Sequence, residues 1–232
     1  MLIGSIVLVG TAVVLGWFWI PLSLIVLPVL IWLFAFFRDP ERAVPQEQHA
    51  MVSPADGVVS DIVEIDHDPL LDAPAIRVGI FLSVFNVHIN RAPCDGRVVD
   101  VIYKKGKFIN AMRHNEASSN NESNTLVLAE PQGERRVAVV RQIVGLIARR
   151  IVCTARVGDQ VKRGDRIGMI KFGSRTELYI PKWLEPKIQV QVGQKVRGAA
   201  DVIAILGQPI HVRDAEPVDE EYEPIAPRRT PA

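Results

Sequence analysis

Gly173-Ser174 is the pair of residues in this sequence that could carry the most unusual chemistry. It stands between two strand-like runs, where Gly-Ser is also typical of a plain turn. The Ser174 hydroxyl could attack the Gly173 carbonyl carbon, because a glycine can adopt the strained backbone that this attack needs. An N-to-O acyl shift, elimination and hydrolysis would then leave a new chain that begins with a pyruvoyl group. Its ketone is an electrophile that no ordinary side chain provides.

Two further segments contain groups that could move protons. Asp56 lies in an Asp-Gly motif at 53–57, where it is either a turn residue or a carboxylate that orients or accepts a proton. His88 lies in the mostly apolar run 81–93 and is the best general acid or base in the sequence, although a lone histidine there could also be a core residue. His114 could line a pocket.

Charge and cysteine content exclude several classes of protein. The 232 residues include 27 Lys and Arg against 26 Asp and Glu, so the formal net charge is +1. Nucleic-acid-binding domains normally show a clustered basic excess, and we expect no nucleic-acid partner. Cys94 and Cys153 belong to no Cys-x-x-Cys motif, and no His-x-His or His-Glu-x-x-His pair occurs. The sequence therefore predicts no metal site.

The amino-terminal segment, residues 1–37, predicts a transmembrane helical anchor. It contains no charged residue and no histidine. As one helix it would exceed the roughly 30 Å hydrocarbon core of a bilayer. Two arrangements fit: a single span with an extra interfacial piece, or a helical hairpin that turns near Pro21. Arg38 and Arg42 follow directly, and the positive-inside tendency then places the rest of the chain on the cytoplasmic side of the cell membrane.

The remainder divides into a linker (38–50), a mostly β domain (51–212) and a flexible, acidic, proline-rich tail (213–232). In the domain, short Val- and Ile-rich runs separated by Gly, Pro and Asp predict strands and tight turns.

Two internal echoes indicate a degenerate duplication of this domain. The motif Pro-x-Asp-Gly-x-Val occurs at 54–59 and again at 93–98. The Val-Gly motif at 157–164 is matched by another at 192–198. Both motifs, in this order, occur in lipoyl- and biotinyl-type domains, so we expect a barrel-sandwich hybrid-like fold with internal duplication.

Taken together, these segments resemble the short form of the phosphatidylserine decarboxylase proenzymes. The matching pieces, in the family's order, are 37–42, 53–57, 81–93, 121–125, 142–150 and 172–175. The resemblance implies self-cleavage between Gly173 and Ser174 into a β chain, 1–173, and an α chain, 174–232. The two chains would form a heterodimer, and the family suggests further association of such αβ units. The implied reaction converts phosphatidylserine in the membrane to phosphatidylethanolamine and CO₂, through a Schiff base to the pyruvoyl group made from Ser174.

The resemblance also implies roles for single residues. The family's cleavage is attributed to a Ser-His-Asp arrangement, which maps here onto Ser174 and Asp56. His88 is the acid expected to reprotonate the substrate carbanion. Long-form relatives have a second histidine where this sequence has Arg91, which cannot act as a base at neutral pH. Either His88 does both jobs or another residue such as His114 assists. The candidates for binding the substrate phosphate are Arg91 and Arg175.

One alternative from another functional class fits part of the sequence. A non-enzymatic, membrane-anchored barrel-sandwich adaptor would account for the apolar segment and the Val-Gly motifs. It gives no reason for Gly173-Ser174 to occur together with Asp56 and His88.

Overall fold

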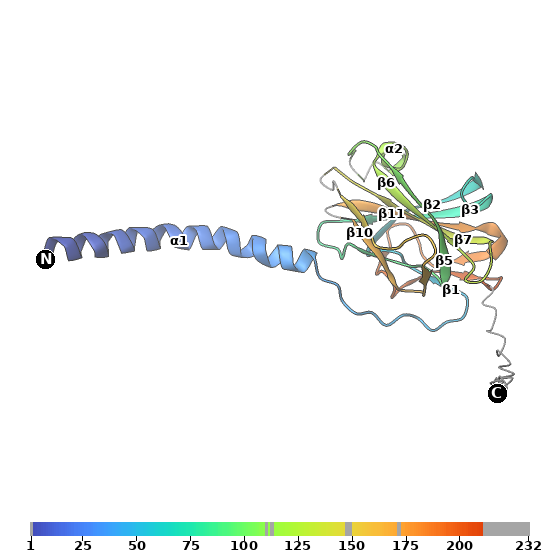
Figure 1. Ribbon diagram of the computed structural model, residues 1–232, viewed down its shortest axis with the longest axis horizontal. Coiled ribbons are helices and arrows are strands. Elements are labelled where there is room, and N and C mark those ends of the chain that lie inside the picture. Colours follow the sequence, from blue (N-terminus) through green and yellow to red (C-terminus); the bar gives the residue numbers. More distant parts are fainter. Residues whose placement is uncertain (1, 110, 112–113, 147–149, 171–172, 211–232) are drawn as a thin grey trace, which may run out of the picture.

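The computed structural model describes residues 2–109, 111, 114–146, 150–170 and 173–210, and leaves out the side chains of part of its two α-helices. The tail predicted at 213–232 lies outside these residues. A long helix, α1, extends from a domain that contains the strands (Figure 1). The mostly β fold class is therefore confirmed.

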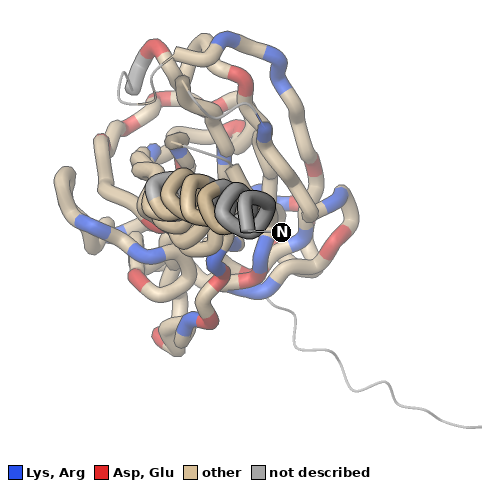
Figure 2. The backbone as a smooth tube through the Cα atoms, turned by 90° about the vertical axis from the view of Figure 1, so that its left-hand side faces the viewer, with Lys and Arg blue, Asp and Glu red and all other residues tan. Residues whose placement is uncertain are grey.

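Helix α1 (Leu2–Phe36) contains 35 residues and is continuous through Pro21 and Pro28. It is about 52 Å long at 1.5 Å per residue, and it has no turn near Pro21 of the kind that a hairpin needs. Figure 2 looks along this uncharged helix toward the domain, which bears charges of both signs. Judged on the described residues alone, no helix combines the length and the hydropathy that a membrane span requires.

The domain begins at the first strand after the linker. Its elements are β1 (Ala50–Val52), β2 (Gly57–Asp68), β3 (Ala73–Leu82), β4 (Ile89–Arg91), β5 (Gly96–Lys104), α2 (His114–Asn120), β6 (Ser123–Ala129), β7 (Arg136–Ile143), β8 (Ile151–Cys153), β9 (Gln160–Val161), β10 (Arg166–Ile170), β11 (Ser174–Pro181), the 3₁₀ helix η1 (Lys182–Leu184), β12 (Pro186–Ile188), β13 (Lys195–Val196) and β14 (Val202–Leu206).

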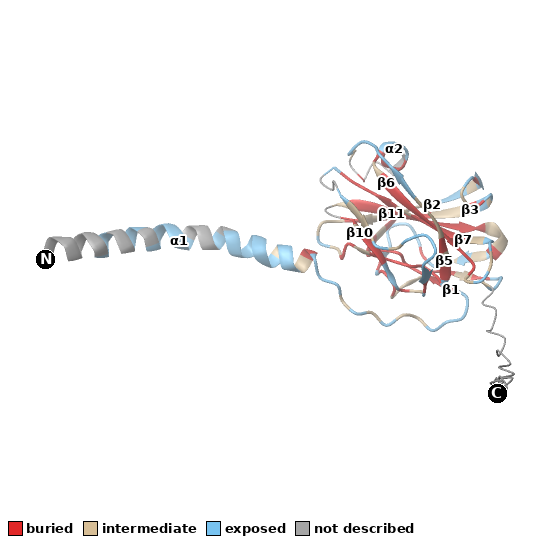
Figure 3. Cartoon of the chain, in the orientation of Figure 1, coloured by how far each residue is buried: buried red, intermediate tan, exposed pale blue. Residues whose placement is uncertain are grey.

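The strands pair in three antiparallel sheets. The largest has the order β13-β2-β3-β11-β7-β6-β5-β9, and the smaller ones have the orders β4-β10-β8 and β1-β14-β12. Strand β11 lies near the middle of the large sheet, and all eight of its residues are buried. Most of its apolar side chains pack into the main core with residues of β2, β3, β6 and β7. Figure 3 shows β11 as a buried strand. Its first residue is Ser174, so the core fixes the position of the predicted nucleophile.

The two sequence echoes occupy equivalent places in the large sheet. Val196 of β13 pairs with Gly57 at the start of β2, and Val161 of β9 pairs with Gly96 at the start of β5. In each copy the valine two residues after that glycine exchanges two backbone hydrogen bonds with a Val-Gly turn. These bonds are Val59 N to Gln194 O (2.9 Å), Gly193 N to Val59 O (2.8 Å), Val98 N to Asp159 O (2.9 Å) and Gly158 N to Val98 O (2.8 Å).

Glycine is needed in both Val-Gly turns for a conformational reason. Gly158 has φ +97° and Gly193 has φ +89°, backbone values that residues with a Cβ rarely adopt. The repeated Val-Gly motif therefore records a repeated backbone conformation.

Candidate active site

Ser174 lies at the junction between a loop and the central strand. Its backbone pairs with Leu82 at the end of β3. Gly173, immediately before it, has φ +64°, in the left-handed region that favours glycine. The Ser174 side chain is fully buried, and its Oγ atom has no hydrogen-bond partner among the described residues. Buried hydroxyls are normally hydrogen-bonded, so an unpaired one directly after a glycine in the left-handed conformation indicates a functional position.

The backbone at Gly145 lies close to the carbonyl group of Gly173, at the peptide bond that is predicted to break. A Cβ atom placed on Gly145 would lie only 2.1 Å from the carbonyl oxygen of Gly173 and 3.3 Å from the Cβ of Ala111. Only glycine therefore allows this close approach. No pattern in the sequence singles out Gly145, although it lies in the segment 142–150 that resembles the family.

His88 follows a tight turn between β3 and β4. Ser83 N donates to Asn86 Oδ1 (2.8 Å), and Asn86 N donates to Ser83 O (3.0 Å). The His88 Nδ1 atom is 2.9 Å from the Asn86 carbonyl oxygen, which can only accept, so Nδ1 carries the proton. The other ring nitrogen, Nε2, then has a lone pair. It is buried, and no partner for it is found in the described part of the chain.

The His88 ring is neutral at physiological pH. Burial lowers the pKa of His88 to about 4, and the positive charge of Arg38 acts in the same direction. The Asn86 carbonyl and the negative charge of Asp56 oppose this shift. Since a neutral imidazole accepts a proton, His88 is suited to act first as a base.

The segments that carry His88 and Ser174 are held together by backbone hydrogen bonds. Ile170 N, four residues before Ser174, donates to His88 O (3.2 Å). A Cβ built on Gly173 would lie 3.9 Å from Val84 Cγ1 in the turn before His88. Two buried polar atoms without described partners, Ser174 Oγ and His88 Nε2, thus belong to adjoining segments.

Buried side chains also connect strands β4 and β11 through a series of hydrogen bonds. Asn90, two residues after His88, donates through Nδ2 to the Oγ1 of Thr176, two residues after Ser174 (3.0 Å). Gln142 Nε2 donates to Asn90 Oδ1 (2.8 Å), and Asn124 Nδ2 donates to Gln142 Oε1 (3.1 Å). Because all four side chains are buried, these bonds fix the register of the site. Sequence reasoning gave none of the four a role.

Asp56 lies within electrostatic reach of His88 but is bonded to other groups. Its Oδ2 atom accepts from Arg42 Nη2 (2.8 Å), and its Oδ1 atom accepts from the backbone N–H of Gly198 (2.8 Å). Its negative charge favours the protonated form of His88. No hydrogen bond between Asp56 and His88 is found among the described residues, so a serine-protease-like Asp-His contact is not seen.

Arg91 holds the linker rather than standing free for a substrate. It donates to Asp39 Oδ1 (2.6 Å) and to the carbonyl oxygens of Gly164 (3.1 Å) and Pro40 (3.3 Å). Arg166 also pairs with Asp39. Arg91 and Arg166 therefore share the single carboxylate of Asp39.

Arg175 lies on the opposite face of β11 from Ser174, because successive side chains of a strand alternate. It is fully buried, 2.7 Å from Asp61 Oδ2 and 2.9 Å from Glu177 Oε1. The charge of Arg175 lowers the pKa of Asp61 although burial opposes this change. This arrangement is a buried ion-pair cluster. The remaining candidate, His114, begins α2, and its side chain lies outside the described residues.

The end of α1 contacts the site directly. The rings of Phe36 and His88 have centroids 4.3 Å apart. Arg38 donates to Ala35 O (2.6 Å) and to Phe85 O (2.9 Å), the latter in the turn before His88. Together with the pairs Asp39–Arg91 and Arg42–Asp56, these contacts place residues 36–42 over the site.

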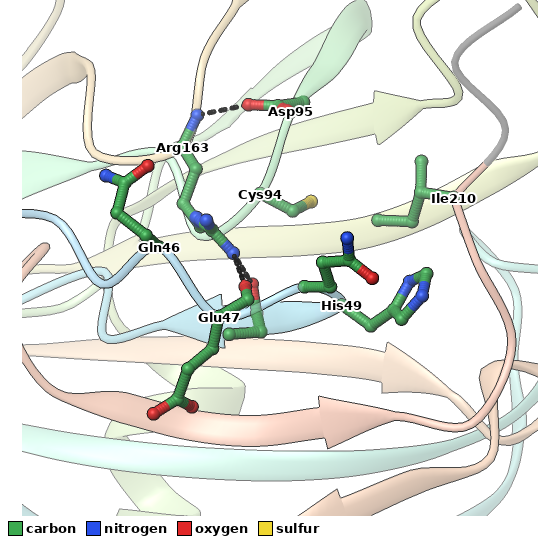
Figure 4. A pocket seen from close by; sticks show the side chains of 9 residues that line it. Gln46, Glu47, His49, Cys94, Asp95, Arg163 and Ile210 are labelled. Carbon is green, nitrogen blue, oxygen red and sulfur yellow. Dashed lines mark hydrogen bonds between the residues drawn. The ribbon is translucent and has the colours of Figure 1, made fainter.

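A pocket of about 250 Å³ is found elsewhere, beside β1 (Figure 4). There Arg163 donates to the carbonyl oxygens of Glu47 (2.9 Å) and Ala50 (2.8 Å). None of the predicted site residues lines this pocket. In the described residues no group of three or more His, Cys, Asp or Glu side chains is arranged to hold a metal ion.

Comparison with known proteins identifies the family of this chain. The sequence model of the phosphatidylserine decarboxylase family matches residues 29–204. A phosphatidylserine decarboxylase proenzyme of Rhodopirellula baltica is 49% identical over 204 residues, covering 88% of this chain and 84% of the relative. Proenzymes of the same name from Carboxydothermus hydrogenoformans and Ruegeria pomeroyi are 44% and 43% identical, over 85% and 83% of this chain and 91% and 84% of theirs. The chain belongs to the phosphatidylserine decarboxylase family of enzymes.

Proposed function

We propose that this chain is a proenzyme that cleaves itself between Gly173 and Ser174 and then decarboxylates phosphatidylserine to phosphatidylethanolamine. One observation carries the proposal. Ser174 Oγ and His88 Nε2 are both buried, and neither has a hydrogen-bond partner among the described residues. They lie on adjoining segments, and Ser174 directly follows a glycine in the left-handed conformation. Family membership supports the substrate class.

In the cleavage step, neutral His88 takes the proton of the Ser174 hydroxyl. The Oγ atom bonds to the Gly173 carbonyl carbon, and the C–N bond to Ser174 breaks as His88 passes its proton to the leaving amine nitrogen, which gives an ester. Loss of the Ser174 Cα proton then breaks the ester C–O bond and releases the Gly173 carboxylate, the end of the β chain (1–173). The dehydroalanine left at position 174 takes up water and loses ammonia, so the α chain (174–232) begins with a pyruvoyl group.

Residue 174 suits a pyruvoyl group because its side chain is fully buried beside a base. A pyruvoyl group supplies an electrophilic carbonyl and an electron sink for loss of the substrate carboxylate. The protein excludes bulk water there, which disfavours a charged carboxylate and so favours its loss. His88 can afterwards hold a proton at Nε2 and return it to the substrate carbon.

Residues 1–37 are proposed to anchor the protein in the cell membrane, with the β domain on the cytoplasmic side. Support comes from the absence of charge in this segment and from Arg38 and Arg42 directly after it. An anchor would keep the active site close to a substrate that resides in the bilayer. Protease treatment of inverted and right-side-out vesicles tests the topology, since only inverted vesicles should expose the domain.

We further infer that the domain is a barrel-sandwich hybrid-like fold that arose by duplication. The matching hydrogen bonds around Val59 and Val98 support this view. So does the strand order, in which β13-β2-β3-β11 mirrors β9-β5-β6-β7. On this interpretation Ser174 lies on a strand next to the centre of a symmetric sheet.

Intact mass spectrometry of the purified chain tests the proposed function. We expect two chains, and the smaller should begin at position 174. Its mass should be about 17 Da below that of the same chain with an amino-terminal serine, because a ketone replaces the amine. The Ser174→Ala variant should remain one uncleaved chain. A cleaved Ser174→Ala product would contradict the mechanism. A wild-type chain that stays whole at 25.7 kDa after incubation with membranes would favour the adaptor alternative.

A further inference from the structure

The proposed substrate needs a positive charge close to the reacting centre. Its phosphodiester is negatively charged throughout the reaction and requires a partner if it leaves water. The arginines named from the sequence do not meet this need. Arg91 pairs with Asp39, and Arg175 is buried between Asp61 and Glu177.

Arg38 differs from the other arginines described around His88. Arg42 is paired with the carboxylate of Asp56, and Arg91 and Arg166 share the carboxylate of Asp39. Arg38 instead donates hydrogen bonds to two backbone carbonyls, those of Ala35 and Phe85. Neutral carbonyls hold a guanidinium in place without cancelling its charge. A guanidinium has five N–H donors, and these two contacts leave capacity for an anion.

Arg38 lies beside the catalytic histidine. It is two residues from Phe36, whose ring stacks on His88, and Phe85 belongs to the turn before His88. Its charge acts on His88, since it helps to lower the pKa of that ring. Arg38 is also the first charged residue after the apolar segment. It therefore combines nearness to the reacting centre with the place where a lipid headgroup would meet the domain.

The two anionic groups of the substrate make different demands. A cation held against the carboxylate would stabilise the charge that decarboxylation must remove, and would oppose the reaction. The phosphodiester keeps its charge from substrate to product. A guanidinium near the site therefore suits the phosphodiester.

We propose that Arg38 binds the phosphodiester of the phospholipid substrate and so sets the position of the headgroup relative to residue 174. This proposal rests on the proposed function. Two carbonyls hold the guanidinium at the end of α1, and its remaining N–H groups contact phosphate oxygens.

The test measures kcat and KM with dihexanoyl phosphatidylserine below its micelle concentration, so that no charged surface is present. Arg38→Gln should raise KM about tenfold or more and change kcat less than about threefold. Arg38→Lys should raise KM less, because lysine keeps the positive charge but lacks the planar, forked set of N–H donors of a guanidinium. The matched control is Arg156→Gln, at an exposed arginine in the loop before β9, which should leave both constants unchanged.

Each other outcome counts against a defined part of the argument. An unchanged KM in a cleaved Arg38→Gln enzyme overturns the proposal. A KM that rises on anionic vesicles but not on the monomeric lipid also overturns it, because Arg38 would then serve surface attraction only. If Arg38→Gln remains uncleaved, an Arg38→Lys enzyme with wild-type KM overturns the forked contact. If the wild type itself releases no CO₂ from the lipid, the proposed function fails instead.

Discussion

The ring of Phe36, at the end of α1, stacks on the ring of His88, with centroids 4.3 Å apart and planes inclined by 33°. Both side chains are almost completely shielded from solvent, with 1% and 0% exposure. The segment that precedes the β domain therefore forms one wall of the environment of His88. Because burial is the main cause of the low pKa of His88, this contact connects the amino-terminal helix to the chemistry of the site.

Phe36→Ala should raise the pKa of His88 from about 4 toward its ordinary value of 6.5, because water would reach the ring. NMR titration of the His88 ring in a Ser174→Ala background, which stays uncleaved, measures this change. The control is Phe34→Ala, since Phe34 is 79% exposed and should leave the titration unchanged. An unaltered His88 pKa in Phe36→Ala would show that other groups alone keep the ring dry.

The depressed pKa of His88 also makes the stability of the proenzyme depend on pH. The unfolded chain takes up a proton near pH 6.5, whereas folded His88 does so only near pH 4. The contribution of His88 is therefore fully present above pH 6.5 and is lost as the pH falls from 6.5 toward 4. The loss approaches about 3 kcal/mol. Urea unfolding of Ser174→Ala with and without His88→Asn, at pH 7 and pH 4.5, should show it as a difference between the two chains.

Gly145→Ala should slow self-cleavage strongly, because the new methyl group would fall 2.1 Å from the Gly173 carbonyl oxygen. The backbone at 145 or the Gly173 peptide must shift, and misplacing the attacked carbonyl carbon slows the acyl shift. Gel analysis of the uncleaved fraction over time gives the rate. Gly16→Ala is the control, since a Cβ at Gly16 meets nothing within 4 Å. Cleavage of Gly145→Ala at the wild-type rate would mean that the close contact has no role in processing.

Local patterns in the sequence were enough to predict the mostly β domain and to single out Ser174 and His88 as candidates. The Val-Gly and Asp-Gly motifs prescribe turn conformations, so their repetition predicted equivalent turns, which Gly158 and Gly193 show. Ser174 and His88 could be named because each breaks the pattern of its surroundings. Tertiary partners were beyond this reasoning. The contact between Arg91 and Asp39 joins residues 52 positions apart, and no local sequence pattern predicts it.

The strand pattern of the sequence itself argues against one candidate for substrate binding. Arg175 follows Ser174 in a predicted strand, and adjacent strand residues point to opposite faces. Arg175 was therefore a poor candidate for binding the same substrate as residue 174. The continuous α1 shows a different limit, since Pro21 suggested a turn and the helix nevertheless continues past it.

Arg175→Met should destabilise the uncleaved Ser174→Ala proenzyme by about 3–5 kcal/mol, because it leaves the carboxylate of buried Glu177 without its guanidinium partner. Chemical unfolding measures the loss. The double variant Arg175→Met with Glu177→Gln should recover part of it, since the unpaired charge is removed. An Arg175→Met enzyme with normal stability but a raised KM would restore the substrate-binding role first expected for this residue.

Asp56 and Arg42 can be separated by a matched pair of variants. Both Asp56→Asn and Arg42→Gln break the same 2.8 Å ion pair, but only the first removes the negative charge that favours protonated His88. As His88 receives the Ser174 proton, that charge stabilises the imidazolium. If Asp56 assists the base, Asp56→Asn should therefore slow self-cleavage at least about tenfold more than Arg42→Gln. Purified, uncleaved chains released from denaturant provide the time course. Equal slowing in the two variants would mean that Asp56 acts only by holding the linker through Arg42.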